Sequence, residues 1–368
     1  MKQILYHDFL RESQEFIRGP ERELNVAVMP DFFLDRFISL NHDEKAFCKS
    51  IRNVIKRKGG SIDRIRQTDI RGGNAINTAS ALAALGANVT PIICTNSLGA
   101  QILRFYLKHL KLDLSHLKTF KEPSITTAIE FKTKSGKINV MLRDVGDLAR
   151  FGPRDLNDED FEMIENADYV CVFNWAGTRQ FGTELARTIF NHVRTNGKGK
   201  TYYDTADPTP NAERIPQLVR NVLKGKSVNI LSMNENEAIC FASLLNNKGK
   251  GFGRNMRFEE SAIKAARILA THLSARIDLH TTSYSASFTG TCETVVPAFR
   301  VPVLRVTGAG DAWNAGNILG DAHRLSDEGR LTLANAVAAY YISSPKGMHP
   351  TKKQLMRFLK KTERKMKP

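Results

Sequence analysis

A run of five residues near the C-terminal end of the chain has the chemistry of an anion-binding turn followed by a general base. It comprises Thr307, Gly308, Ala309, Gly310 and Asp311. A strand-like stretch, residues 301–306, precedes it, and a helix-like stretch follows it. Gly and Ala let a backbone come close to a phosphate, which the free N–H groups and the dipole of a helix N-terminus attract. Asp311 would take the proton of a hydroxyl that attacks the bound phosphorus; the plainer alternative is a glycine turn with a helix-capping Asp.

A second group of small and polar residues opens a helix-like stretch that ends at Gly86. Gly72 and Gly73 at its start permit the close approach of a polyol. Asn77 can both donate and accept hydrogen bonds, which suits adjacent hydroxyls. Alternatively, the two glycines form only the turn that enters the helix.

A third group, residues 234–237, has the pattern N-x-x-E and follows an apolar stretch. Together with GGN-A-x-N-x-A at residues 72–79 and TGAGD at residues 307–311, it resembles the signatures of the ribokinase-like (PfkB) carbohydrate kinases. The three groups occur in the order and at about the spacing of that family. The resemblance therefore spans roughly residues 24–360.

The resemblance implies a role for each of these residues. Asp311 is the base, and the charge on the transferred group is stabilised by the backbone N–H groups of Gly308, Ala309 and Gly310. The nucleotide is bound by Asn234, Glu237 and Thr307, with Glu237 also holding Mg²⁺ through water. The acceptor is bound by Asp35, Gly72, Gly73 and Asn77. A solvated turn residue is the alternative for Asp35, and an exposed helix residue is the alternative for Glu237.

Strand-like and helix-like stretches alternate along the 368 residues, which favours one α/β domain. The resemblance implies a ribokinase-like fold, in which a doubly wound, mostly parallel sheet is flanked by helices and carries a small β-sheet lid. We expect an N-terminal extension over residues 1–23 and the kinase domain over residues 24–368. The lid segments are expected near residues 34–70 and 119–146, and the second of these has the alternation of a hairpin.

The formal net charge of +16 suits nucleic acid, an acidic membrane surface or small acidic substrates, and does not decide among them. The densest basic stretch, residues 352–367, surrounds an apolar stripe, so we interpret it as a docked amphipathic helix and do not expect nucleic acid as a partner. No apolar run reaches the ~20 residues that span a bilayer, and the first residues lack the core of a signal peptide. A cytoplasmic protein without a membrane partner is expected.

Together these features predict an ATP-dependent, Mg²⁺-requiring kinase that transfers the γ-phosphoryl group to a hydroxyl of a sugar or a sugar-containing small molecule. The acceptor stays open, because members of the family act on free sugars, sugar acids, sugar phosphates, nucleosides and inositol. Arg71 and Arg143 would suit an anionic acceptor. The alternatives are a nucleoside kinase of the same fold, a relative that uses ADP, and a catalytically silent relative that binds sugar or nucleotide. A homodimer formed through the lid is a further expectation.

One residue beside the anion-binding turn departs from the family's pattern. Many relatives are activated by K⁺, and the first Asp of their D-T-x-G-A-G-D run supplies an oxygen ligand to that ion. Arg305 stands at the matching position, and a guanidinium has a permanent positive charge and no acceptor oxygen. We therefore do not expect K⁺ to be required. The alternative is that Arg305 points to solvent and leaves backbone carbonyls to bind K⁺.

Overall fold

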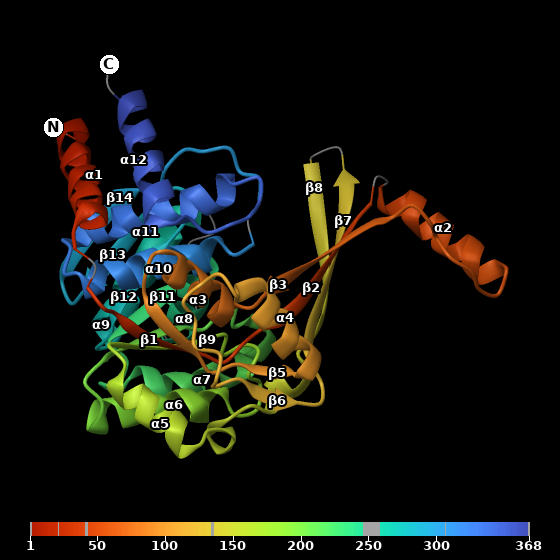
Figure 1. Ribbon diagram of the computed structural model, residues 1–368, viewed down its shortest axis with the longest axis horizontal. Coiled ribbons are helices and arrows are strands. Elements are labelled where there is room, and N and C mark those ends of the chain that lie inside the picture. The colour runs from red at the N-terminus through yellow and green to blue at the C-terminus, as the bar shows by residue number, and fades with distance from the viewer. Residues whose placement is uncertain are drawn as a thin grey trace.

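The structure is a computed structural model that describes residues 2–20, 22–40, 43–133, 136–245, 258–305 and 307–366. Its centre is an eight-stranded sheet with the order β14-β13-β12-β11-β10-β9-β1-β4 (Figure 1). The strands from β4 to β12 in this order are parallel, and β13 and β14 extend the sheet antiparallel at one edge. In chain order they are β1 (Asn25–Met29), β4 (Asn88–Pro91), β9 (Tyr169–Phe173), β10 (Lys200–Asp204), β11 (Ile230–Met233), β12 (Arg276–His280), β13 (Tyr284–Thr289) and β14 (Cys292–Pro297).

Helices cover both faces of this sheet because its strands are apolar on both sides. Along β1, Ala27 and Met29 belong to one buried cluster, and Val26 and Val28 belong to the other. The first cluster is completed by α5 (Asp158–Asn166), α6 (Gly182–Asn196), α7 (Ile215–Leu218), α8 (Glu235–Leu245) and α9 (Phe258–His272). The second is completed by α1 (Lys2–Arg18), α3 (Asn74–Ala84), α4 (Ser97–Leu107), α10 (Ala309–Ala322), α11 (Asp327–Ser343) and α12 (Lys352–Met366). The doubly wound α/β architecture that the sequence predicts is confirmed.

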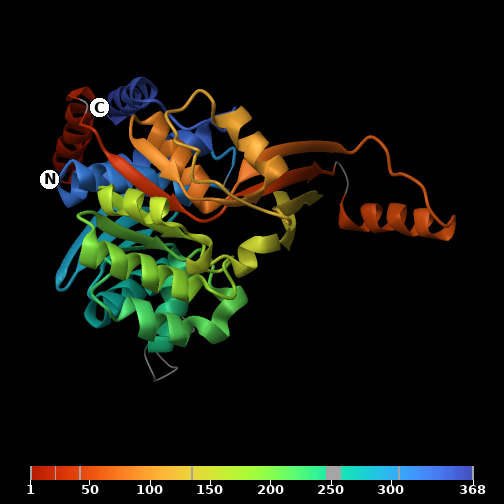
Figure 2. The ribbon, with the colours of Figure 1, turned by 60° about the horizontal axis from the view of Figure 1, so that its bottom comes forward.

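A second sheet, of four strands in the order β3-β2-β7-β8, projects from this body (Figure 1). We call it the lid sheet; it consists of β2 (Phe33–Ser39), β3 (Arg66–Gly72), β7 (Ser124–Thr133) and β8 (Gly136–Asp144). At its far end, away from the body, stands α2 (Glu44–Lys56), none of whose residues is buried (Figures 1 and 2). Two short strands, β5 (Cys94–Asn96) and β6 (Lys118–Phe120), pair with each other. The small β-sheet predicted for a lid is thus present.

Residues 301–305, before the anion-binding turn, do not form a strand, so the predicted strand over residues 301–306 is wrong there, and Val306 lies outside the described residues. Residues 301–305 have no regular secondary structure, and Val303 and Leu304 are exposed. Pro302 lacks a backbone donor, and the N–H of Leu304 donates to the carbonyl of Ile342 at the end of α11. The backbone of this stretch is therefore bonded to the end of α11 instead of pairing in the sheet.

The first and last helices, α1 and α12, lie side by side on the body (Figure 1). Within the predicted N-terminal extension, α1 packs against α11: Leu10 is fully buried, and Ser13 Oγ donates to the carbonyl of Gly329 at 3.2 Å. The apolar stripe of α12 is buried at Leu355 and Leu359, which confirms the docked basic helix. Among the helices of the described residues, none combines the length and the apolar character that crossing a membrane requires.

Candidate active site

The predicted site residues meet in one cavity of about 810 Å³ at the carboxyl ends of the parallel strands. The ends of β10, β11 and β12 and the starts of α3, α8 and α10 contribute to it, together with β2 of the lid sheet. Of the predicted residues, Gly72 alone is not part of the lining. The lining includes Asp35, Gly73, Asn74, Asn77, Asp204, Asp207, Asn234, Glu237, His280, Thr307, Gly308, Ala309, Gly310 and Asp311.

Asp311 lies in the first turn of α10 and is buried, with 5% of its surface exposed. Asn74 Nδ2 donates to its Oδ1 at 2.8 Å, and Asn77 Nδ2 donates to its Oδ2 at 3.0 Å. Both amides come from the start of α3, so two helix starts meet at this carboxylate. Asn77, predicted to bind the acceptor, therefore also holds the predicted base.

The turn before Asp311, residues 307–310, has the features of an anion site, and we call it the anion turn. Gly308 is the N-cap of α10 with a φ of +83°, a left-handed conformation that favours glycine. Glycine has no side chain that could cap the helix, so no N-cap side chain accepts hydrogen bonds from the N–H groups of the first turn of α10. These residues line the cavity, and the helix dipole favours an anion beside them.

Burial and neighbouring carboxylates raise the pKa of Asp311. Burial, followed by the charges of Asp204 and Asp31, raises the pKa of Asp311 to about 8, against the hydrogen bonds from Asn77 and Asn74. Burial also raises the pKa of Asp204 and of Asp31. Burial thus favours the neutral form of these carboxyls, and a cation bound beside them would favour their ionised form.

We expect the folded protein to lose stability as the pH rises from about 4 to about 8, in part through Asp311. The pKa of this group is raised from 3.8 to about 8, so the folded state binds its proton more tightly than the unfolded state, and deprotonation across that window favours unfolding. Asp311→Asn has no such proton, so its melting temperature should fall less between about pH 5 and about pH 8.5. Thermal melts of both proteins over this range measure the difference, and parallel curves would contradict it.

Asp35, on β2 of the lid sheet, marks the end of the cavity predicted to bind the acceptor. Its Oδ1 is buried and has no hydrogen-bond partner among the described residues. Burial raises the pKa of Asp35 to about 6, against a hydrogen bond with Thr126 and the charge of Arg143. A Cβ on Gly72 would lie 2.0 Å from Asp35 Oδ2, so glycine at that position leaves room for the carboxylate. A buried acceptor oxygen beside a cavity is suited to a ligand hydroxyl.

Close packing and a positive φ both favour glycine at Gly73. Its φ is +104°, and a Cβ there would lie 2.7 Å from the carbonyl oxygen of Asp31. The carboxylate of Asp31 caps α3, accepting from the N–H groups of Asn74 and Ala75 at 2.8 and 2.9 Å. The protein's own packing thus accounts for both glycines, and the close approach of a polyol stays a prediction.

Asn234 and Glu237 form a reciprocal cap at the start of α8. The N–H and Nδ2 of Asn234 donate to the two carboxylate oxygens of Glu237 at 2.9 and 2.7 Å, and the N–H of Glu237 donates to Asn234 Oδ1 at 3.0 Å. Glu237 is 4% exposed, which excludes the alternative of an exposed helix residue. Burial, and secondly the charge of Asp204, raises its pKa.

His280 lies at the end of β12 and was not predicted from the sequence to be a site residue. Its ring centroid lies 5.0 Å from that of Trp313, and a Cβ on Gly310 would lie 3.1 Å from its Cε1. Burial lowers the pKa of His280 to about 4, so the ring is neutral at neutral pH. Its Nε2 is buried without a hydrogen-bond partner in the described part of the chain. The available signal was its position at the carboxyl end of a parallel strand.

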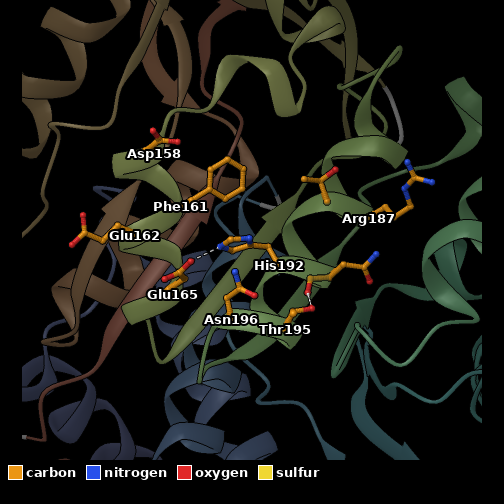
Figure 3. A pocket seen from close by; sticks show the side chains of 10 residues that line it. Asp158, Phe161, Glu162, Glu165, Arg187, His192, Thr195 and Asn196 are labelled. Atoms are coloured by element: carbon orange, nitrogen blue, oxygen red, sulfur yellow. Dashed lines mark hydrogen bonds and ion pairs between the residues drawn. The ribbon is translucent and has the colours of Figure 1, made fainter.

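A second hollow, of about 940 Å³, lies on the surface between α5 and α6 (Figure 3). Acidic residues line it, and Glu165 Oε1 and His192 Nε2 are 2.8 Å apart within it. Its lining is the outer surface of two helices and includes none of the predicted site residues. The cavity at the strand ends is therefore the candidate active site.

A doubly wound sheet with a lid sheet, and with a buried carboxylate behind a small-residue turn, defines a ribokinase-like protein. The sequence matches the model of the pfkB family carbohydrate kinases over residues 50–354. The chain belongs to this family. Among curated proteins, none matches it.

Solved structures with the same fold include sugar and nucleoside kinases. A ribokinase from Arabidopsis thaliana, solved with ribose and ATP, is 19% identical, with 93% of this chain and 99% of that chain covered and a TM-score of 0.68. A carbohydrate kinase from Agrobacterium tumefaciens is 20% identical (92% and 97% covered, TM-score 0.66). An adenosine kinase from Sinorhizobium meliloti is 16% identical (93% and 98% covered, TM-score 0.67). These likenesses confirm the predicted ribokinase-like fold.

Proposed function

We propose that this protein is a kinase that transfers the γ-phosphoryl group of ATP to a hydroxyl of a sugar or a sugar-containing small molecule. The observation that carries the proposal is the placement of Asp311, a buried carboxylate held by two amides in the first turn of α10. The residues of that turn line the same cavity, and the first turn of a helix has N–H groups without intrahelical partners. A base and an anion hole in one turn are what phosphoryl transfer to a hydroxyl needs.

One end of the cavity binds the acceptor, and the other end binds the nucleotide. Asp35 accepts a hydrogen bond from the acceptor and orients a second hydroxyl toward Asp311, which takes its proton during attack on the phosphorus. The charge on the transferred group is stabilised by the backbone N–H groups of Gly308, Ala309 and Gly310. Thr307 and Asn234 contact the phosphates of the nucleotide.

We place Mg²⁺ at the donor end, held mainly through water, because no three His, Cys, Asp or Glu side chains of the described residues are grouped so that they could ligate an ion directly. Glu237, Asp204 and Asp207 offer carboxylate oxygens, which this ion prefers, and Glu237 would hold it through a water. Burial raises the pKa of Glu237 and of Asp204, and the charge of Asp204 raises that of Glu237 further, so a cation bound there would favour the ionised form of both carboxyls. When bound, the ion neutralises the donor phosphates.

Glu237→Gln should raise the Mg²⁺ concentration needed for half-maximal turnover by about 10-fold to 100-fold. The amide keeps the shape of the side chain and loses its charge, so the acceptor KM should change little. Glu260→Gln, an exposed position in α9, is the matched control. A Mg²⁺ titration of the three proteins measures the effect, and an unchanged titration in Glu237→Gln would leave this residue with the capping role alone.

Of the two arginines that would suit an anionic acceptor, Arg143 is the better placed. Its charge acts on Asp35, and its guanidinium lies 5.1 Å from the centre of the Phe33 ring. Arg71 instead donates to Ser80 Oγ in α3. Neither arginine lines the cavity, so support for an acceptor that carries a phosphate or a carboxylate rests on the charge of Arg143 near Asp35.

A panel of free sugars, sugar acids, sugar phosphates and nucleosides, assayed for nucleotide consumption with ATP and with ADP, tests the proposed function. Phosphorylation of at least one sugar-containing acceptor, lost in Asp311→Asn, would support it. Phosphorylation of nucleosides alone would establish the alternative of a nucleoside kinase. Binding without turnover across the whole panel would favour a catalytically silent relative.

A homodimer formed through the lid sheet is part of the proposal. Exposed apolar side chains on β7 and β8 support it: Ile125, Ile138, Val140 and Leu142. Strand pairing of Leu142 with Thr127 and of Val140 with Ile129 places them on one face, where a second copy would cover them. Light scattering of the purified protein distinguishes two chains from one.

A further inference from the structure

The guanidinium of Arg305 lies beside the end of α11, next to the anion turn in sequence. Its Nη2 donates to the backbone carbonyls of Ser344 and Pro345 at 3.0 and 3.1 Å. These carbonyls follow the last turn of α11, at the negative end of its dipole, where cations are stabilised. Arg305 therefore does not point to solvent, and it supplies positive charge to carbonyls that would otherwise attract a cation.

The surroundings of this guanidinium are closely fitted to it. A Cβ on Gly347, whose φ is +62°, would lie 1.8 Å from Arg305 Nη1, so glycine leaves room for the guanidinium in this position. Arg305 Cζ lies 5.8 Å from the centre of the Tyr341 ring, within the range of a cation–π interaction. The hydroxyl of Tyr341 in turn lies against Gly308, where a Cβ would come within 2.7 Å of it. Contacts thus run from the turn after α11, through Arg305 and Tyr341, to the anion turn.

We infer that Arg305 is a built-in cation, which takes the place of a monovalent metal ion beside the anion turn and holds that turn in its phosphate-binding shape. The inference rests on the proposed kinase function. K⁺, which the family implies, does not fit beside Arg305, because the carbonyls already accept hydrogen bonds from a permanently charged group that would repel a second cation. Within the described residues Arg305 makes no ion pair, so carbonyl dipoles and the Tyr341 ring balance its charge.

The first test compares turnover in K⁺ and in tetramethylammonium at matched ionic strength. The unmodified enzyme should be equally active in both. Arg305→Asp removes the cation and introduces an oxygen ligand, so its kcat should be at least about tenfold lower in tetramethylammonium and should recover in K⁺. The acceptor KM should change little, since Asp35 belongs to the lid sheet. Several-fold activation of the unmodified enzyme by K⁺ would overturn the inference.

The second test does not require turnover. Without substrates, K⁺ should raise the melting temperature of Arg305→Asp above its value in tetramethylammonium and leave that of the unmodified protein unchanged. Arg357→Ala removes the same charge from an exposed position of α12 and should behave like the unmodified protein. Equal responses of Arg305→Asp and the unmodified protein to K⁺ would overturn the inference.

The two tests separate the role of Arg305 from the proposed function. If no acceptor is phosphorylated, the proposed function fails, and the melting temperatures still decide whether Arg305 replaces a metal ion. If Arg305→Asp does not fold, the melting temperature of the unmodified protein in the two salts decides the question, and a rise specific to K⁺ counts against the inference.

Discussion

Asp311→Asn should lower kcat by at least about 10²-fold and leave the affinity for the nucleotide nearly unchanged. The amide keeps the size of the side chain and can still pair with one of the two amides that hold it, but it cannot take a proton. Because the raised pKa of Asp311 belongs to the free protein, kcat/KM of the unmodified enzyme should also fall as the pH drops below about 8. Steady-state kinetics and calorimetric titration of nucleotide measure the two quantities separately.

Asp63→Asn is the matched control for this substitution, since Asp63 is exposed in the loop between α2 and β3. It should retain the kcat of the unmodified enzyme. Near-normal turnover in Asp311→Asn would remove Asp311 from the reaction and end the proposed mechanism. Loss of nucleotide binding together with turnover would show instead that the anion turn depends on the carboxylate for its shape.

Asp35→Ala should weaken acceptor affinity by about 2 to 4 kcal/mol, because it removes a charge-assisted hydrogen bond and leaves the donor of the acceptor unpaired. Nucleotide affinity should hardly change, since Asp35 lies on the lid sheet and Asn234 and Glu237 lie at the start of α8. Isothermal titration with each ligand measures both affinities. Equal losses for the two ligands would mean that Asp35 supports the fold instead.

Two further variants sharpen this test. Gly72→Ala would place a methyl group 2.0 Å from Asp35 Oδ2, so it should displace the carboxylate and reproduce the acceptor defect. Asp69→Ala is the control on the same sheet, because Asp69 is an exposed carboxylate of β3 that pairs with Arg36. If all three variants lower the affinity for the acceptor equally, the lid sheet as a whole is responsible for the loss, and Asp35 is not.

The parts of the site that could be predicted are those whose signals are local. The cap formed by Asn234 and Glu237 closes within four residues, and the turn at Gly308 needs only small residues before a helix. Such patterns survive in the sequence because neighbours along the chain make the contacts. The alternation of strands and helices is equally local and predicted one α/β domain, whereas the doubly wound sheet was expected from the family resemblance.

The parts that could not be predicted depend on residues far apart in the chain. Asp31 and the N–H of Ala75 are 44 residues apart, and Arg305 and the carbonyl of Ser344 are 39 residues apart. The stretch over residues 301–305 has the composition of a strand, but its place along α11 is decided by tertiary packing. The burial of Glu237 could not be predicted either, because the sequence of α8 does not indicate which residues cover its first turn.

Because α2 lies at the far end of the lid sheet, a rotation of the sheet would displace α2 further than it displaces Asp35. Asp35 lies near the base of β2, while α2 lies beyond its tip, so a small rotation of this sheet around a ligand moves the helix through a longer arc (Figure 2). The chain also carries an exposed thiol on each part, Cys48 in α2 and Cys292 in β14 of the body. If the lid sheet rotates when an acceptor binds, the distance between two dyes attached to these thiols would change, and energy transfer between the dyes would measure that change.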